Sequence, residues 1–145
     1  MNRRQMSYRC PKASPAGTGV IHNWRLVMRG VADIVQSDGD FVPVALWWVT
    51  SDCIRALDAY EGAPSLYERR VVSVFDENAY RVRTGFIYVM TAQRRGLYVC
   101  SQSYLQCIVE GYGDFGIVDT SPIWAAQIAA KKRCIAAIKR EYIMD

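Results

Sequence analysis

Apolar and polar residues alternate most regularly in the segment 79–90, where the sequence reads AYRVRTGFIYVM. Because residues two apart lie on the same face of a strand, this pattern predicts a strand with an aromatic and apolar face and an arginine-bearing opposite face. The segments 20–29 and 67–76 are also rich in β-forming residues, and each predicts a further strand. Glu77 and Asn78 form the predicted turn between the last two strands.

Two more strands are expected before residue 50. The segment 41–49, FVPVALWWV, is almost wholly apolar and predicts a strand that is buried on both faces. Pro43 has no backbone N–H group, so it confines the start of that strand to a sheet edge or a bulge. A shorter strand is predicted at 31–35, and the Ser-Asp-Gly-Asp sequence at 37–40 predicts the turn that joins the two.

Three segments outside the central region predict helices. The segment 3–9 has room for one helical turn, and the segment 101–109 predicts a helix that ends at Gly111. A Ser-Pro pair at residue 121 is a favourable start for a last helix that continues to residue 142. The predicted buried face of that helix consists of residues spaced by seven, three and four positions: Ile128, Ile135, Ile138 and Tyr142.

The segment 57–70, LDAYEGAPSLYERR, joins the end of another helix to the start of a strand. Thr50 or Ser51 is the expected N-cap of this helix, and Gly62 is the expected C-cap. Glu61 is then the last helical residue, where the negative end of the helix dipole raises the pKa of a carboxyl group toward the range useful for proton transfer. From spacing alone, an ordinary solvated surface glutamate remains the alternative.

The order of these elements places the chain in the α+β class. We expect a small mixed or antiparallel β-barrel with flanking helices. With 145 residues, of which 51% are hydrophobic, the chain is long enough for a sizeable core and is expected to form a single domain over residues 1–145. It contains no internal repeat, low-complexity tract or interdomain linker.

Composition excludes several classes of protein. No apolar run is long enough to cross a bilayer, and the basic N-terminal segment has no apolar core after it, so we expect neither a membrane partner nor a signal peptide. With no CxxC pair and His22 as the single histidine, we expect no metal site and reduced thiols in the cytoplasm. The net charge of +4 weakly favours anionic ligands, and we expect no nucleic-acid partner because the basic residues are dispersed.

The remaining candidate chemistry rests on carboxylates. The sequence has no glycine-rich phosphate loop and no Ser-His-Asp set. Asp58 and Glu61 lie three apart on one helical face, whereas glycosidases take their two carboxylates from separate elements. Asp58 is therefore expected to cap or brace the loop around Gly62. A single-carboxylate mechanism at Glu61, with nearby tyrosines as walls, is the chemistry that these residues permit.

The LDAYEG motif, followed by Tyr67, Arg69 and Val71, resembles the gamma-glutamylcyclotransferase-like family. This family includes the plant avirulence-induced-gene proteins and the gamma-glutamylamine cyclotransferases. The resemblance extends to the segment 2–13 with its RCPKA sequence, and to the segment 103–111 with its tyrosine, isoleucine and glycine. It covers about three quarters of the chain and implies a compact β-barrel with flanking helices.

The resemblance also implies a reaction. In this family the α-amine of a γ-glutamyl group attacks its own side-chain carbonyl group, which gives 5-oxoproline and releases an amine or amino acid. The implied partner is a small-molecule γ-glutamyl substrate. The reaction requires no cofactor, because the cyclisation is neither redox chemistry nor dependent on an energy source. The resemblance assigns proton transfer to Glu61, and it makes Asn2, Tyr67 and Tyr88 the expected substrate-binding residues.

The chain departs from the family pattern at its start. Family members have a first strand that ends in a tyrosine-glycine-serine-asparagine loop, whose backbone N–H groups bind the substrate. Asn2 stands where this loop would end, so the loop is expected to lie before Met1 or to be missing. A barrel without that strand has an unpaired edge, from which we expect pairing with a second copy of the chain.

Two non-catalytic interpretations stay open. In one, a protein with the family fold binds a small anionic ligand such as a nucleotide, using Arg3, Arg4, Arg69 and Arg70. In the other, the chain is a structural relative whose pocket is filled by side chains.

Overall fold

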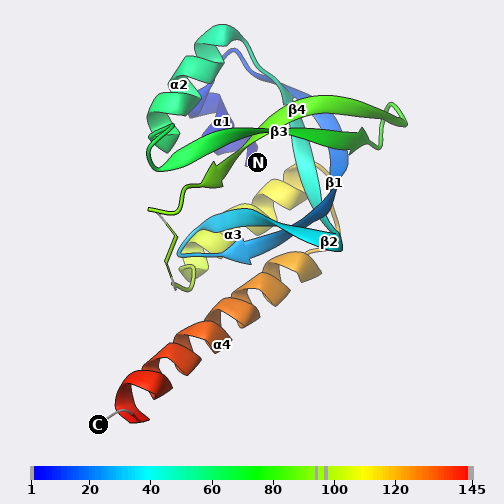
Figure 1. Cartoon of the computed structure of the whole chain (residues 1–145). Helices are drawn as coiled ribbons and strands as arrows, with labels where there is room; N and C mark the ends of the chain where they lie inside the picture. The colour runs from blue at the N-terminus through cyan, green and yellow to red at the C-terminus, as the bar shows by residue number, and fades with distance from the viewer. Residues whose placement is uncertain (1, 94, 97, 144–145) are drawn as a thin grey trace.

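The computed structural model describes residues 2–93, 95–96 and 98–143, with residues 141–143 described by their backbone alone. Each of the first two helices is followed by a pair of strands, and the chain ends in two further helices (Figure 1). In chain order they are α1 (Arg3–Arg9), β1 (Ser14–Met28), β2 (Ala32–Trp48), α2 (Ser51–Glu61), β3 (Tyr67–Asp76), β4 (Arg81–Met90), α3 (Gln102–Asp114) and α4 (Ser121–Ile143).

The four strands form one antiparallel sheet in the order β2-β1-β3-β4. The α+β class is thus confirmed, but the predicted barrel is wrong, because the sheet is open among the described residues. Its two halves, β1–β2 and β3–β4, share only the pairs Gly19–Asp76 and Val20–Phe75. Between the edge strands β2 and β4, a side-chain contact replaces ladder pairing: the Met90 N–H group donates to the Asp33 carboxylate at 3.0 Å.

The turn predicted at 37–40 is wrong, because those residues lie inside β2. The chain instead reverses beside Gly30, whose φ is 84°, and the Arg29 N–H group donates to the Val31 carbonyl group. The Asp-Gly sequence lies opposite a register shift in β1, where Asn23 has a φ of 62° and its side chain accepts a hydrogen bond from the Gly39 N–H group. The Asp-Gly sequence therefore does not end the strand. It lies where the pairing of β1 with β2 shifts in register, inside a long hairpin.

The segment 41–49 is not buried on both faces, contrary to the prediction. Val42 and Val44 are buried, whereas Phe41 and Trp48 are more than half exposed. Phe41 lies on the face of β2 opposite Val42 and Val44, and Trp48 is the last residue of the strand, beyond the sheet cluster. Pro43 does lie on an edge strand, as predicted, and it is paired with Val20 of β1. An edge strand has a neighbouring strand on one side only, so a residue without an N–H group is tolerated there.

Two hydrophobic clusters form the core. The first lies on the sheet and contains Ile21, Ile34, Val42, Val44, Val72, Val74 and Val89. The second joins α3 and α4 to the end of the β1–β2 hairpin and contains Met28, Cys100, Leu105, Tyr112, Ile123, Ala126 and Ala130. Leu26 packs against both clusters and so connects the sheet to the helical layer.

The helix 101–109 was predicted to end at Gly111, but α3 continues to Asp114. Gly111 and Tyr112 are both buried, so the glycine lies inside the helix. The tyrosine side chain packs in the second cluster and directs its hydroxyl group to the Pro43 carbonyl group at 3.4 Å. Burial of this last turn outweighs the helix-ending tendency of glycine.

The predicted buried face of α4 is also wrong. Ile128, Ile135 and Ile138 are each about half exposed, and the side chain of Tyr142 lies outside the described residues. The helix packs instead through Ile123, Ala126 and Ala130. These residues are spaced by three and four, and the small alanines permit close approach to the rest of the protein. Within the described ranges, none of the helices combines the length and apolar character that crossing a bilayer requires.

Candidate functional site

Helix α2 places Glu61 at its last position, as predicted. Thr50 is the N-cap and accepts a hydrogen bond from the Cys53 N–H group at 3.3 Å. Gly62 is the C-cap in the left-handed region with a φ of 64°, and the Ala63 N–H group donates to the Asp58 carbonyl group at 2.9 Å. The helix therefore has a well-defined end, which fixes the backbone from which the Glu61 side chain projects.

The carboxyl group of Glu61 is partly buried, and this burial raises its pKa above the ordinary value for glutamate. The positive charge of Arg9 opposes the increase. The direction agrees with the prediction from the helix dipole, but desolvation is the main physical cause. The Arg9 guanidinium group donates to the Tyr60 hydroxyl group at 2.6 Å and lies 3.8 Å above its ring centroid, so α1 is tied to the residue before Glu61.

Beside Glu61, Asp58 connects α2 to β3 and β4. The Tyr88 hydroxyl group donates to its carboxylate at 2.6 Å, and the Arg69 Nε–H group lies 3.1 Å from the same oxygen. Burial, followed by this hydrogen bond, raises the pKa of Tyr88 well above its usual range. Asp58 was predicted to brace the loop around Gly62, and its carbonyl group does so, while its side chain fixes the Tyr88 hydroxyl group.

A cavity of about 240 Å³ lies where α1 and α3 meet the two edge strands. Apolar residues of β2, among them Ile34, Val42 and Val44, form one part of its lining. The polar side chains that line it are Asn2 just before α1, Gln5 and Arg9 from α1, Asp33 from β2, Tyr88 from β4, and Tyr104 and Tyr112 from α3. Two of the predicted site residues, Asn2 and Tyr88, therefore line this cavity, whereas Glu61 and Tyr67 are not part of its lining.

Two contacts join the end of α2 to the cavity lining: Arg9 donates to Tyr60, the residue before Glu61, and Tyr88 donates to Asp58, one turn earlier. The charge of Glu61 contributes to the raised pKa values of both Tyr88 and Tyr104, and Arg9 in turn acts on Glu61. Tyr67 also contributes to the pKa of Tyr104, so the predicted residue at the start of β3 belongs to the same neighbourhood. The site is thus a cavity with a carboxyl group beside it.

Tyr104 was not predicted as a site residue, although its segment was part of the family resemblance. Its hydroxyl group accepts a hydrogen bond from the Ala32 N–H group at 3.0 Å. Burial is the main cause that raises the pKa of Tyr104 to about 12, which keeps the hydroxyl group protonated at neutral pH. Tyr104 can therefore donate a hydrogen bond to a ligand in the cavity.

Asn2 has structural partners for both ends of its side-chain amide. Its Oδ1 atom accepts from the Gln5 N–H group at 3.1 Å and so caps α1. Its Nδ2 atom donates to the Cys107 carbonyl group of α3 at 3.5 Å. Asn2 thus anchors the α1 side of the cavity to α3, in addition to lining it.

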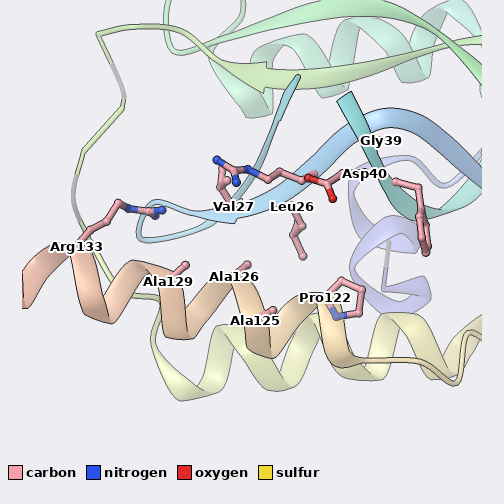
Figure 2. Close-up of a pocket in the computed structure, with 11 residues that line it drawn as sticks. Leu26, Val27, Gly39, Asp40, Pro122, Ala125, Ala126, Ala129 and Arg133 are labelled. Atoms are coloured by element: carbon pink, nitrogen blue, oxygen red, sulfur yellow. The ribbon is translucent and has the colours of Figure 1, made fainter. Parts of the chain in front are cut away.

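A second hollow, of about 380 Å³, contains none of the predicted site residues (Figure 2). It lies between α4 and the β1–β2 hairpin, with Ala125, Ala126 and Ala129 on the helical side and Arg133 near one end. Arg133 donates to the Met28 carbonyl group at 3.1 Å, so it also joins α4 to the hairpin. The smaller cavity beside Glu61 remains the candidate site.

Metal ligands do not gather in the part of the chain that the structure describes: no group of three or more His, Cys, Asp or Glu side chains is close enough to bind an ion. Three of the four arginines proposed for an anionic ligand have other partners. Arg69 pairs with Asp58, Arg70 pairs with Glu68 at 2.6 Å, and Arg3 lies over the Phe115 ring at 4.7 Å. Arg9, which was not among the four, is the arginine that lines the cavity.

A family model described as "Gamma-glutamyl cyclotransferase, AIG2-like" matches residues 1–106 of this chain. The chain belongs to this family. The resemblance inferred from LDAYEG and its flanking segments is therefore confirmed. No curated protein matches the chain.

Solved structures of similar fold support the family assignment at the level of architecture. A structure described as gamma-glutamyl cyclotransferase has a TM-score of 0.70 and 20% identity, over 88% of this chain and 79% of that one. An uncharacterized protein from Homo sapiens, loc79017, has a TM-score of 0.68 and 22% identity over 87% and 78% of the two chains. An AIG2-like protein from Mus musculus has a TM-score of 0.54 and 22% identity, with 72% of each chain covered. At these sequence identities, the similarity to the solved structures shows a shared fold alone.

Proposed function

We propose that this chain cyclises a γ-glutamyl amine or peptide to 5-oxoproline and releases the amine, with Glu61 as general acid and base. Membership of the gamma-glutamyl cyclotransferase, AIG2-like family supports the reaction class. The observation that carries the role of Glu61 is its position at the end of α2, where burial raises its pKa beside Arg9, Tyr88 and Tyr104 of the cavity.

The proton transfers follow from the bonds that form and break. The neutral α-amine attacks the side-chain carbonyl carbon of its own γ-glutamyl group, and the new nitrogen–carbon bond leaves this nitrogen positively charged and acidic. The Glu61 carboxylate accepts the proton. The bond between the same carbon and the leaving nitrogen then breaks as Glu61 returns the proton to the departing amine. A carboxyl group with a raised pKa suits both steps, because a pKa shifted toward the working pH lets one group both accept and release a proton.

The cavity supplies groups that suit a γ-glutamyl substrate. The Arg9 guanidinium group, on α1, is a suitable partner for the substrate α-carboxylate. The Tyr104 hydroxyl group is protonated and can donate to the carbonyl oxygen as it acquires negative charge. A hydrogen bond to Asp58 holds Tyr88 in place, and its ring forms a wall of the cavity. Tyr67 and Asn2 keep the substrate-binding roles that we proposed from the sequence.

The test is release of 5-oxoproline from a panel of γ-glutamyl amines and γ-glutamyl dipeptides by the purified chain. We expect activity with at least one compound and a loss of about a hundredfold to ten-thousandfold in kcat in Glu61→Gln, the range that general acid–base catalysis contributes. Glu110→Gln is the matched control, because Glu110 is exposed on α3 and outside the cavity lining. Unchanged activity in Glu61→Gln would contradict the assigned role, and no 5-oxoproline from any compound would contradict the reaction.

A further inference from the structure

Helix α4 has an exposed apolar face that no part of the described chain covers. Four of its residues form this face, which we name the outer stripe: Trp124, Ile128, Ile135 and Ile138. Their side chains are 46%, 54%, 54% and 53% exposed, respectively. The spacing of four, seven and three aligns them along one side of the helix. Ala126 and Ala130, which pack in the second cluster, lie on the far side of the helix from this stripe, so the outer stripe points away from the core.

Basic residues accompany this stripe. Lys131 lies within it, three positions after Ile128 and four before Ile135, and it is exposed. Lys132 and Lys139 are exposed on one flank, and Arg140 is exposed farther round the helix. The sequence contains no acidic residue from Ser121 to Arg140. From Lys131 to Arg140, the exposed surface of α4 is therefore both apolar and positively charged.

The shape of this surface restricts its partner. Figure 1 shows α4 as a long helix whose C-terminal half extends beyond the sheet and the other helices. From Trp124 to Ile138 the stripe spans about 21 Å at 1.5 Å per residue. Such a stripe is straight and convex, whereas the two hollows described above lie elsewhere, under α4 and beside α1. It fits a flat surface better than a ligand that needs enclosure.

A second copy of α4 is a poor partner on electrostatic grounds. Residue 131 is the midpoint of the stripe, so two paired stripes, whether parallel or antiparallel, place Lys131 against the Lys131 of the other copy. Like charges at such a position oppose association. A partner with negative charge and an apolar layer beneath it satisfies both the lysines and the isoleucines.

We propose that the outer stripe of α4 binds an anionic membrane surface. The isoleucines and Trp124 enter the boundary between headgroups and acyl chains, and the lysines reach the lipid headgroups. The helix lies in the plane of the surface and does not cross the bilayer. This inference replaces the expectation of no membrane partner, which rested on the absence of a long apolar run. It is independent of the proposed reaction.

The test is co-sedimentation of the full chain with phosphatidylcholine vesicles that contain or lack phosphatidylserine. We expect binding only to the anionic vesicles, weakened by added salt. Lys131→Gln with Lys132→Gln should lower the partition coefficient on the order of tenfold or more, since each basic residue near an anionic surface adds to the attraction. Arg55→Gln with Arg81→Gln removes the same charge from α2 and β4 and should have little effect.

Ile135→Gln with Ile138→Gln should also weaken vesicle binding, and Trp124→Phe should abolish the blue shift of emission that vesicles induce in the parent protein. These residues are exposed, and circular dichroism of each variant verifies the fold. Absence of binding to anionic vesicles, or equal binding by the two charge variants, would overturn the proposal. So would stripe-dependent binding to poly-glutamate without vesicle binding, which assigns the surface to an acidic protein, or stripe-dependent dimers in solution.

Discussion

At the residue scale, Glu61 is a glutamate whose charge is partly withdrawn from water. Glu61 ends a helix beside an aromatic cavity, and burial raises its pKa while Arg9 limits the increase. A surface glutamate, the alternative that spacing alone left open, has no such desolvation. The carboxyl group therefore binds a proton more strongly than an exposed glutamate does, and at neutral pH its charged form has a cost to the folded state.

That cost has a measurable dependence on pH. The Glu61 pKa is higher in the folded than in the unfolded chain, so the folded state binds the proton more strongly. Its contribution to stability is present below the unfolded pKa of about 4.3 and is lost as pH rises through the folded pKa. We therefore expect Glu61→Gln to raise the free energy of unfolding at neutral pH, and the gain to disappear in acid.

Urea unfolding of both proteins over a range of pH values measures this difference. Glu110→Gln serves again as the control, and its effect should be small throughout. A difference between Glu61→Gln and the parent that is the same at acid and neutral pH would show that the carboxyl group has no raised pKa.

At the scale of elements, the two caps of α2 determine where the glutamate lies. The Thr50 side chain satisfies one backbone donor at the start, and the left-handed Gly62 satisfies carbonyl groups at the end. Both caps are predictable from the sequence, because capping depends on the chemistry of single residues next to a helix. The position of the Glu61 backbone therefore depends on these two caps.

Gly62→Ala should disturb that geometry. A Cβ atom there would lie 2.9 Å from the Leu66 Cδ1 atom, and the φ of 64° is unfavourable for alanine. We expect a loss of about 1–2 kcal/mol in the free energy of unfolding and, if the proposed function holds, a fall in 5-oxoproline formation. Thermal and urea denaturation measure the first effect.

Gly113→Ala is the matched control. Gly113 lies in α3, and apart from its chain neighbours and the nearby backbone of its own helix no atom is within 4 Å of the added Cβ position, so alanine should stabilise the protein by less than about 1 kcal/mol. Equal losses in the two variants would mean that the left-handed cap has no special role.

At the scale of the whole molecule, the open sheet leaves two edge strands, β2 and β4. We propose, as expected from the sequence, that copies of the chain associate through such an edge. Val82 of β4 is 67% exposed and adds apolar surface there. Light scattering should show a mass that rises with protein concentration, and Val82→Lys should reduce this rise because an edge lysine opposes strand pairing. A monomeric mass at every concentration would contradict this association.

The predictions that succeeded are those in which a residue and its near neighbours carry the information. Strand β3 begins and ends at the predicted residues, Tyr67 and Asp76, and α2 has the predicted caps. By contrast, the Asp-Gly sequence at 37–40 has the chemistry of a turn, yet it lies within β2, because pairing with β1 along a long hairpin outweighs a local preference.

The sequence by itself determined the family, the α+β class and the position of Glu61 at the end of a capped helix, because these follow from residue chemistry and short spacings. Only the tertiary structure decided that the sheet stays open among the described strands, and that α4 packs through its alanines and leaves its isoleucines exposed. It alone brought Arg9 and Tyr104, ninety-five positions apart, to the cavity beside Glu61. These outcomes depend on which surfaces become buried when the elements pack together, and the spacing of residues along the chain does not determine this.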